Sequence, residues 1–150
     1  MHLTRYSDYA LRTMIYLGIN PDRTCTIPEI SSRYDISQNH LMKIVHHLGK
    51  EGMIETVRGR GGGMRLACDP NTTTVGDIIR ITEDDLNIVE CFDAATNQCQ
   101  ISSACVLQSA LSRALGAFMA TLDDFTLAQI IAPERELAAL LGLERENRRA

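Results

Sequence analysis

The sequence has no apolar run of the roughly 18 or more residues that a membrane-spanning helix needs. Its start, MHLTRYSDYALRTMIYLGIN, mixes charges among apolar side chains and lacks the small-residue cleavage site of a secretory signal. We therefore expect a cytoplasmic protein that does not contact a membrane. An apolar fraction of 45% over 150 residues excludes a disordered chain and is enough to bury a core.

The five cysteines include no pair with the close C-x2-4-C spacing of structural zinc sites, and their odd number fits poorly with a complete disulfide framework. Cys91, Cys99 and Cys105 are instead separated by seven and then five residues. Such gaps leave a roomy loop whose sulfurs can converge on something larger than one ion, and cysteine thiolates bind iron–sulfur clusters. Thiol–disulfide switching, zinc binding and inert thiols remain alternatives, while Cys25 and Cys68 are expected to be structural.

Basic residues are absent between Arg80 and Arg113, where five acidic residues lie. Residues 36–65, in contrast, contain five basic residues against two acidic ones, although the whole chain has a net charge of -4. The charge is therefore polarised along the sequence. The basic segment is the candidate for binding the phosphate backbone of a nucleic acid.

Two short helices with a tight break between them are predicted between Thr26 and Gly52. Thr26 and Glu29 have the spacing of a capping box at the start of the first helix, and residues 35–36 form the break. Ser37 is a suitable N-cap for the second helix, which Gly52 ends. This is the helix-turn-helix pattern, whose second helix enters the major groove. The alternative is a helical hairpin within an ordinary core.

The segment MIETVRGRGGGMRLA follows and predicts strands over residues 53–57 and 64–67, joined by a loop rich in glycine and arginine. A loop tip without side chains lets backbone amides approach phosphates, so this segment is typical of the wing of a winged helix. The second helix would face base edges and phosphates, and the wing would enter the adjacent minor groove. The predicted DNA-binding residues are Ser37, Gln38, Asn39, His40, Lys43, Arg58, Arg60 and Gly61.

The remaining segments predict further helices. A stripe of apolar residues marks an amphipathic helix near the start, and Thr74 with Asp77 caps another. Ser103 is the expected cap of a long helix whose continuous apolar stripe favours packing on a partner helix, and hence a homodimer. Two short helices separated at Pro133 and a charged tail expected to fray complete the chain.

The predicted fold class is mainly α with a small β wing, as a winged helix-turn-helix plus a long dimerisation helix. We expect three regions. Residues 1–80 would form the DNA-binding domain, residues 81–104 the cluster-binding loop region, and residues 105–150 the dimerisation helix and the C-terminal helices.

Five segments together resemble the small winged-helix iron–sulfur repressors that include the NsrR, IscR and RirA proteins. The likeness covers nearly the whole chain, and its segments are LTRYSDYALRTMIYL, SQNHLMKIVHHL, ETVRGRGGGMRL, CFDAATNQCQISSACVL and LDDFTLAQII. The second, third and last are most similar to the NsrR branch, whose members sense nitric oxide through a cluster and repress genes for its detoxification.

This resemblance implies a 4Fe-4S cluster, with a 2Fe-2S cluster as the alternative, at the interface of a homodimer. The metal ligands would be Cys91, Cys99 and Cys105 of one subunit and Asp8 of the partner subunit. Without that role, Asp8 would be an acid paired with Arg12 at helical spacing. IscR-type proteins place a histidine three residues after the last cysteine, whereas this chain has Gln108, which counts against an IscR-type site.

The function that the resemblance implies is repression of operator DNA that is relieved when nitric oxide nitrosylates the cluster. An iron-responsive repressor is one alternative, because the seven-residue first gap also resembles RirA. A cluster-free regulator that forms a disulfide among the three thiols is another. We expect no enzyme, because no nucleotide-binding loop or activated nucleophile is present and nothing resembles a substrate pocket.

Overall fold

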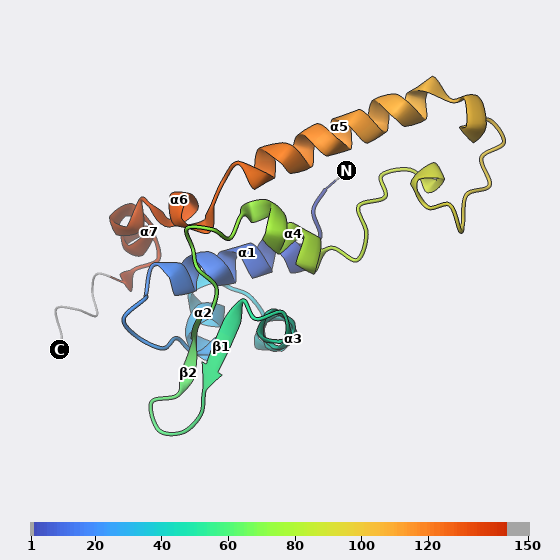
Figure 1. Ribbon diagram of the computed structural model, residues 1–150. Coiled ribbons are helices and arrows are strands. Elements are labelled where there is room, and N and C mark those ends of the chain that lie inside the picture. The colour runs from blue at the N-terminus through green and yellow to red at the C-terminus, as the bar shows by residue number, and fades with distance from the viewer. Residues whose placement is uncertain (1, 144–150) are drawn as a thin grey trace.

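The computed structural model describes residues 2–143, which form seven α-helices and one two-stranded antiparallel sheet (Figure 1). The predicted fold class, mainly α with a small β wing, is confirmed. The elements are α1 (Arg5–Gly18), α2 (Ile27–Tyr34), α3 (Gln38–Lys50), β1 (Ile54–Val57), β2 (Gly63–Leu66), α4 (Val75–Thr82), α5 (Val106–Asp123), α6 (Leu127–Ile131) and α7 (Glu134–Leu140).

Helix α1 lies at the centre of the core. Its predicted apolar stripe is confirmed by the complete or nearly complete burial of Ala10, Met14 and Leu17. Thr13 and Tyr16 are buried as well, because α1 is packed by α3, α4, α6 and β2 rather than by one neighbour. The apolar stripe in the sequence predicts that one face of α1 is buried, whereas in the structure neighbouring elements bury α1 on several sides.

The helix-turn-helix forms as predicted from its local signals. Both bonds of the Thr26–Glu29 capping box are present at the start of α2, and the left-handed backbone of Asp35 (φ 54°) makes the break. The apolar face of α3 is buried at Leu41, Ile44, Val45 and Leu48. Ser37 does occupy the N-cap position of α3, but its side chain makes no capping hydrogen bond there, so that part of the prediction is wrong.

The wing is a hairpin of β1 and β2, in which β1 begins one residue later than predicted and β2 begins and ends one residue earlier. Gly59 and Gly61 in its turn have φ angles of 100° and 78°, which favour glycine because L side chains are strained there. The segment before α2 joins the hairpin, since the Cys25 and Met64 backbones exchange hydrogen bonds of 2.9 and 2.7 Å. Cys25 is fully buried, and this burial raises the pKa of its thiol to about 11.

Helix α5 begins later than the sequence predicts. Its N-cap is Cys105 and not Ser103, which lies instead in a short 3-10 turn, Ser102–Ala104. The reason is local: the N–H groups of Ala104 and Cys105 donate to the carbonyls of Ile101 and Ser102, so the chain turns tightly before the helix starts. The predicted helices on either side of Pro133 are α6 and α7, and the predicted charged tail lies outside the described residues.

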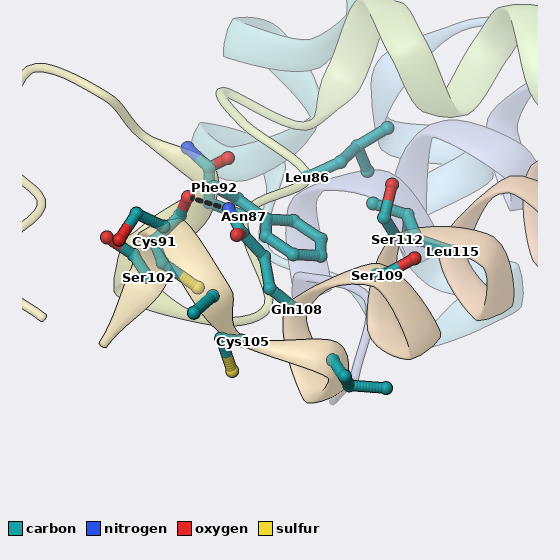
Figure 2. Close-up of a pocket in the computed structure, with 13 residues that line it drawn as sticks. Leu86, Asn87, Cys91, Phe92, Ser102, Cys105, Gln108, Ser109, Ser112 and Leu115 are labelled. Atoms are coloured by element: carbon teal, nitrogen blue, oxygen red, sulfur yellow. Dashed lines mark hydrogen bonds between the residues drawn. The ribbon is translucent and has the colours of Figure 1, made fainter.

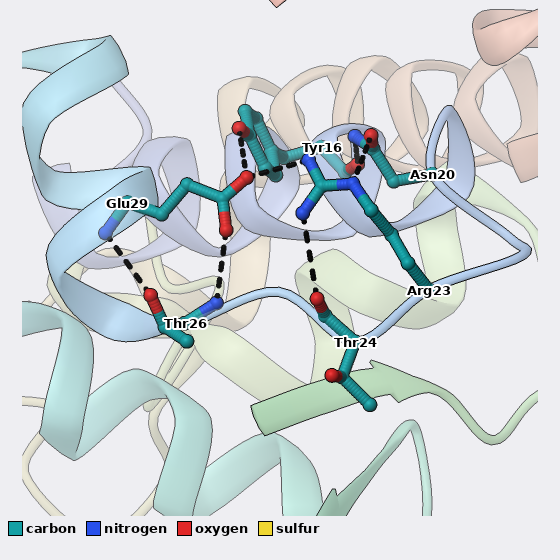
Figure 3. Close-up of polar contacts among 6 residues, drawn as sticks. All are labelled: Tyr16, Asn20, Arg23, Thr24, Thr26 and Glu29. Atoms are coloured by element: carbon teal, nitrogen blue, oxygen red, sulfur yellow. Dashed lines mark hydrogen bonds and ion pairs between the residues drawn. The ribbon is translucent and has the colours of Figure 1, made fainter. Parts of the chain in front are cut away.

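A polar network holds the segment between α1 and α2 (Figure 3). The Tyr16 hydroxyl donates to Glu29 Oε1 at 2.7 Å, and Arg23 Nη2 donates to the same oxygen at 2.5 Å. Arg23 Nε also donates to Asn20 Oδ1 at 3.1 Å. Burial raises the pKa of Glu29, but the bonds from Arg23 and Tyr16 outweigh it and leave that pKa below its ordinary value.

This network predicts a pH-dependent contribution to stability. Because the pKa of Glu29 is lower in the folded chain than in the unfolded chain, its stabilisation is complete above the unfolded value and is lost as the pH falls through the folded value. We expect Glu29→Gln to lower the free energy of unfolding by about 1–2 kcal/mol near neutral pH. The difference from the unmodified protein should shrink as the pH falls below about 4.

Urea unfolding measured over a series of pH values tests this expectation. Glu134→Gln, which changes an exposed acid in the first turn of α7, is the matched control and should have little effect at any pH. A cost for Glu29→Gln that does not vary with pH would contradict the assigned role of the carboxylate.

Candidate nucleic-acid interface and thiol site

All eight predicted DNA-binding residues are exposed in the structure. Those of the helix-turn-helix lie at the N-cap and along the first half of α3, and those of the wing lie in the turn between β1 and β2. Within the described part of the chain, Arg58 and Arg60 form no ion pair, whereas Arg65 is paired with Glu55 across the hairpin. The two wing arginines are thus available for phosphates, and their role in DNA binding stays a prediction.

Helix α3 is held from behind by two aromatic contacts with α1. Tyr6 places its hydroxyl 3.0 Å from Nδ1 of His47, and the two ring centroids lie 5.9 Å apart. The rings of Tyr9 and His40 also pack together, with centroids 6.2 Å apart. Helix α3 is therefore supported at both its start and its end by one helix, and His47 serves packing.

The wing turn has its own support. Thr24 Oγ1 donates to the carbonyl of Gly61 at 3.0 Å, and Thr24 lies beside the Arg23 network (Figure 3). The polar network between α1 and α2 therefore reaches the tip of the wing through one hydroxyl. Nothing in the sequence marks Thr24 for this role, because the two residues are 37 positions apart.

Asp8 lies in the first turn of α1, with its side chain 45% exposed. It forms the expected pair with Arg12, since Arg12 Nη2 is 2.8 Å from Oδ2 and Nε is 3.1 Å from Oδ1. The Arg12 guanidinium also lies about 6 Å from the ring centroids of Tyr9 and Tyr34. In this structure the carboxylate is thus bound within its own helix.

Cys91 and Cys105 line one cavity of about 730 Å³ at the N-terminal end of α5 (Figure 2). Cys91 lies in a 3-10 turn, Glu90–Phe92, and Cys105 is the N-cap of α5. Gln108 Nε2 donates to the Cys91 carbonyl at 2.9 Å, which joins this turn to the first turn of α5. The cavity therefore brings together two of the three predicted thiols.

Cys99 is not part of this lining. It lies in the intervening loop, where its N–H donates to Asn97 Oδ1 at 3.0 Å, and the Asn97 amide donates to Ser102 Oγ at 3.1 Å. Among residues 2–143, no group of three or more His, Cys, Asp or Glu side chains is arranged to hold a metal ion. The predicted three-sulfur site is thus not brought together in the structure, and it stays a prediction.

The donor chemistry nevertheless fits an iron–sulfur cluster. Cys91, Cys99 and Cys105 are all free thiols and all half-buried, so they are available as thiolate ligands. The residues that line the cavity include no aspartate or glutamate. A carboxylate ligand would therefore have to come from outside this cavity, as the predicted role of the partner subunit's Asp8 requires.

Gln108 is a residue whose role the sequence did not reveal. In the sequence, Gln108 only counted against an IscR-type site with a histidine at this position. The structure shows that its amide holds the backbone of Cys91. The one available signal was its spacing, because a residue three positions after Cys105 lies near it on the same side of a helix.

The Rrf2 family, described as iron-dependent transcriptional regulators, matches residues 3–133. The chain belongs to this family. Its relatives include the HTH-type transcriptional regulator NsrR of Bacillus subtilis, which is 46% identical over 145 residues covering 96% of this chain and 99% of that protein. NsrR of Bacillus licheniformis is 45% identical over 143 residues, covering 95% of this chain and all of that protein (100%). These matches confirm the resemblance to the NsrR branch.

Solved structures agree with this Rrf2 assignment. IscR of T. potens has a TM-score of 0.73 at 25% identity and covers 91% of this chain and 90% of its own. CymR of B. subtilis, the global cysteine regulator, has a TM-score of 0.71 at 24% identity, with coverage of 88% and 97%, and supports the fold. As a member of the Rrf2 family the chain is a transcriptional regulator, and the expectation that it is not an enzyme is confirmed.

None of the helices within residues 2–143 is both long and apolar enough to span a membrane.

The bond from Gln108 generates a testable prediction for the protein without metal. In Gln108→Ala the turn that carries Cys91 should open more often, because a bond worth about 1 kcal/mol shifts a local opening equilibrium about fivefold. Cys91 should then be alkylated about fivefold faster, as measured by mass spectrometry of the peptide that contains it. Gln100→Ala, which changes an exposed loop amide, is the control. Equal alkylation rates in all three proteins would remove Gln108 from the thiol site.

Proposed function

We propose that the protein is a dimeric, cytoplasmic repressor that binds operator DNA and senses nitric oxide through a 4Fe-4S cluster held by Cys91, Cys99, Cys105 and the partner subunit's Asp8. The observation that carries the proposal is the cavity at the start of α5, which has two thiols and no carboxylate of its own. The relatives that match nearly the whole chain are regulators named NsrR, which supports this reading.

DNA binding would use the exposed half of α3 and the wing. Ser37, Gln38, Asn39, His40 and Lys43 would contact bases and phosphates in the major groove, and Arg58, Arg60 and Gly61 would contact the minor groove and its backbone. The exposure of all eight residues supports this assignment. Two such surfaces in a symmetric dimer suit an operator with two half-sites.

The dimer would be made by α5. Only Met119 of its 18 residues is buried within the chain, while Val106 and Leu107 are 83% and 64% exposed. A long helix with apolar side chains left in water favours burial against a second copy. In such a dimer the N-terminal part of one α1 would lie near the thiols of the other subunit, as the ligand role of Asp8 requires.

When bound, the cluster would supply iron atoms that react with nitric oxide. The protein's own residues would hold the Cys91 backbone through Gln108 and would let the Asp8 carboxylate bind either iron or Arg12. In the structure Asp8 is bound by Arg12. We infer that a carboxylate released from iron would return to Arg12. Because α1 supports both ends of α3, a shift of α1 would change the spacing of the two recognition helices and release the operator.

An iron-responsive repressor is the second candidate. It is favoured by one specific observation, the description of the Rrf2 family as iron-dependent regulators. The same residues would bind the cluster, and the signal would be the loss of iron rather than its reaction with nitric oxide. A cluster-free regulator that forms a disulfide among the three thiols is the remaining alternative.

Native mass spectrometry of anaerobically purified protein, before and after stepwise addition of nitric oxide, tests the proposal. A dimer that carries a 4Fe-4S cluster in each subunit and gains nitrosyl adducts is the expected result. A cluster that ignores nitric oxide but is lost on iron chelation would favour the iron-responsive candidate, and protein without any cluster would favour the thiol regulator.

The role of Asp8 has its own test. Asp8→Ala should keep the three thiolate ligands but bind the cluster less stably, with a faster loss of its visible absorbance in the presence of a chelator. Asp22→Ala, in the exposed turn after α1, is the control. If the cluster of Asp8→Ala is as stable as that of the control and reacts equally fast with nitric oxide, Asp8 is not the fourth ligand.

The wing is tested by Arg60→Ala. Removing one phosphate contact should weaken operator binding and reduce the slope of log K against log salt by about 1, without change in the cluster spectrum. Arg135→Ala, on α7 and away from the predicted DNA surface, should leave both affinity and slope unchanged. Unchanged DNA affinity in Arg60→Ala would exclude this arginine from the interface.

A further inference from the structure

Helix α5 projects from the DNA-binding part of the molecule and packs on α4 near its C-terminal end (Figure 1). Cys105 marks the projecting end, and Met119 is the one residue of α5 that is buried. An 18-residue helix is about 27 Å long, so a tilt of about 10° at its attached end moves the other end by about 5 Å. The contacts at the attached end therefore determine where the thiols lie.

A bidentate ion pair lies at this attached end. Arg80 of α4 donates from Nη1 and Nη2 to Oδ1 and Oδ2 of Asp123, the last residue of α5, with both distances 2.6 Å. Such a fork fixes direction as well as distance. Arg80 is also 3.8 Å from Asp77, whose other oxygen is bound in the capping box of α4.

Gly76 makes room for this pair. A Cβ atom at Gly76 would lie 1.9 Å from Asp123 Oδ1 and 2.9 Å from Arg80 Nη1, so any side chain there would displace the pair. The N-terminal turn of α4 thus approaches the end of α5 more closely than a residue with a side chain would allow.

The backbone beyond the pair adds a second attachment. Val75 N–H donates to the Phe125 carbonyl and Leu127 N–H donates to the Thr73 carbonyl, both at 2.8 Å. The turn after α5 is thereby joined to the segment before α4. Two attachments on either side of the helix end leave it little freedom to tilt.

We propose that Arg80, Asp123 and Gly76 form a positioning joint that sets the angle of α5 against the DNA-binding helices and so determines how well two half-sites are bound together. This inference rests on the proposed dimer. Arg80 and Asp123 are 44% and 40% exposed, and an exposed ion pair contributes little to stability. The joint therefore predicts an effect on two-site binding that is out of proportion to any effect on unfolding.

Asp123→Asn is the first test, with Asp124→Asn as the matched control next to it. Affinity for operator DNA with two half-sites should fall about tenfold in Asp123→Asn, whereas affinity for a single half-site should change less than about twofold. The combined exchange of Arg80→Asp with Asp123→Arg should recover most of the lost two-site affinity. The control should behave as the unmodified protein does.

Gly76→Ala provides an independent test as a double-mutant cycle. In the unmodified protein it should lower two-site affinity about as much as Asp123→Asn does. In an Asp123→Ala background it should cost nothing further, because the clashing carboxylate is gone and the Arg80 guanidinium, no longer held by it, can move away from the added methyl group. An equal loss of two-site affinity in both backgrounds would show that Gly76 is not needed to make room for the Arg80–Asp123 pair, and would remove Gly76 from the joint.

Sedimentation of each protein separates the failure of the joint from that of the proposed function. A monomeric unmodified protein would overturn the proposed dimer and the joint with it. A dimeric Asp123→Asn with unchanged two-site affinity would overturn the joint alone, as would an equal loss on single and paired half-sites. Loss of the dimer in this variant would assign the pair to assembly instead of positioning.

Discussion

The burial of α1 is the interaction on which the rest of the structure depends. Its side chains fill the core between α3, α4, α6 and β2, so each of these elements is placed relative to the same helix. The tyrosines of its first half support α3, and Asp8 lies between them in sequence. A protein built in this way cannot move its first helix without moving α3. That constraint couples Asp8, the predicted cluster ligand, directly to α3, on which predicted DNA-binding residues lie.

Charge and exposure divide the molecule into two ends with different chemistry. The end formed by α3 and the wing is basic and exposes small polar side chains, as a surface for DNA requires. The other end has free thiols on a loop that contains acids and no lysine or arginine. Helix α4 and helix α5, which is attached to α4 near its C-terminal end, connect the two. In the proposed function, sensing would depend on how rigidly these connections hold, and the proposed joint at Arg80 and Asp123 would act on binding through that rigidity and not through stability.

Much of the fold could be predicted from residues that are close in sequence. The Thr26–Glu29 and Thr74–Asp77 capping boxes form as their spacing predicts, and so does the Asp8–Arg12 pair. The exposed faces of α3 and the wing follow from the same periodicity that predicts their buried faces. Each of these features is decided within about one helical turn, where the chain has few alternatives.

Tertiary structure decided the contacts that join distant segments. Ser37 and Ser103 are good caps by type, yet Ser37 makes no capping bond. Ser103 lies in a turn before the helix, because neighbouring backbone bonds fix the chain there. Gln108, Thr24 and the Arg80–Asp123 pair reach partners 17, 37 and 43 residues away. The sequence alone thus determined the helices, the wing and the kinds of side chain on each surface. Their mutual placement was decided by tertiary contacts, around α1 for most elements and on α4 for α5, since a side chain's distant partner is set by the fold of the whole chain between them.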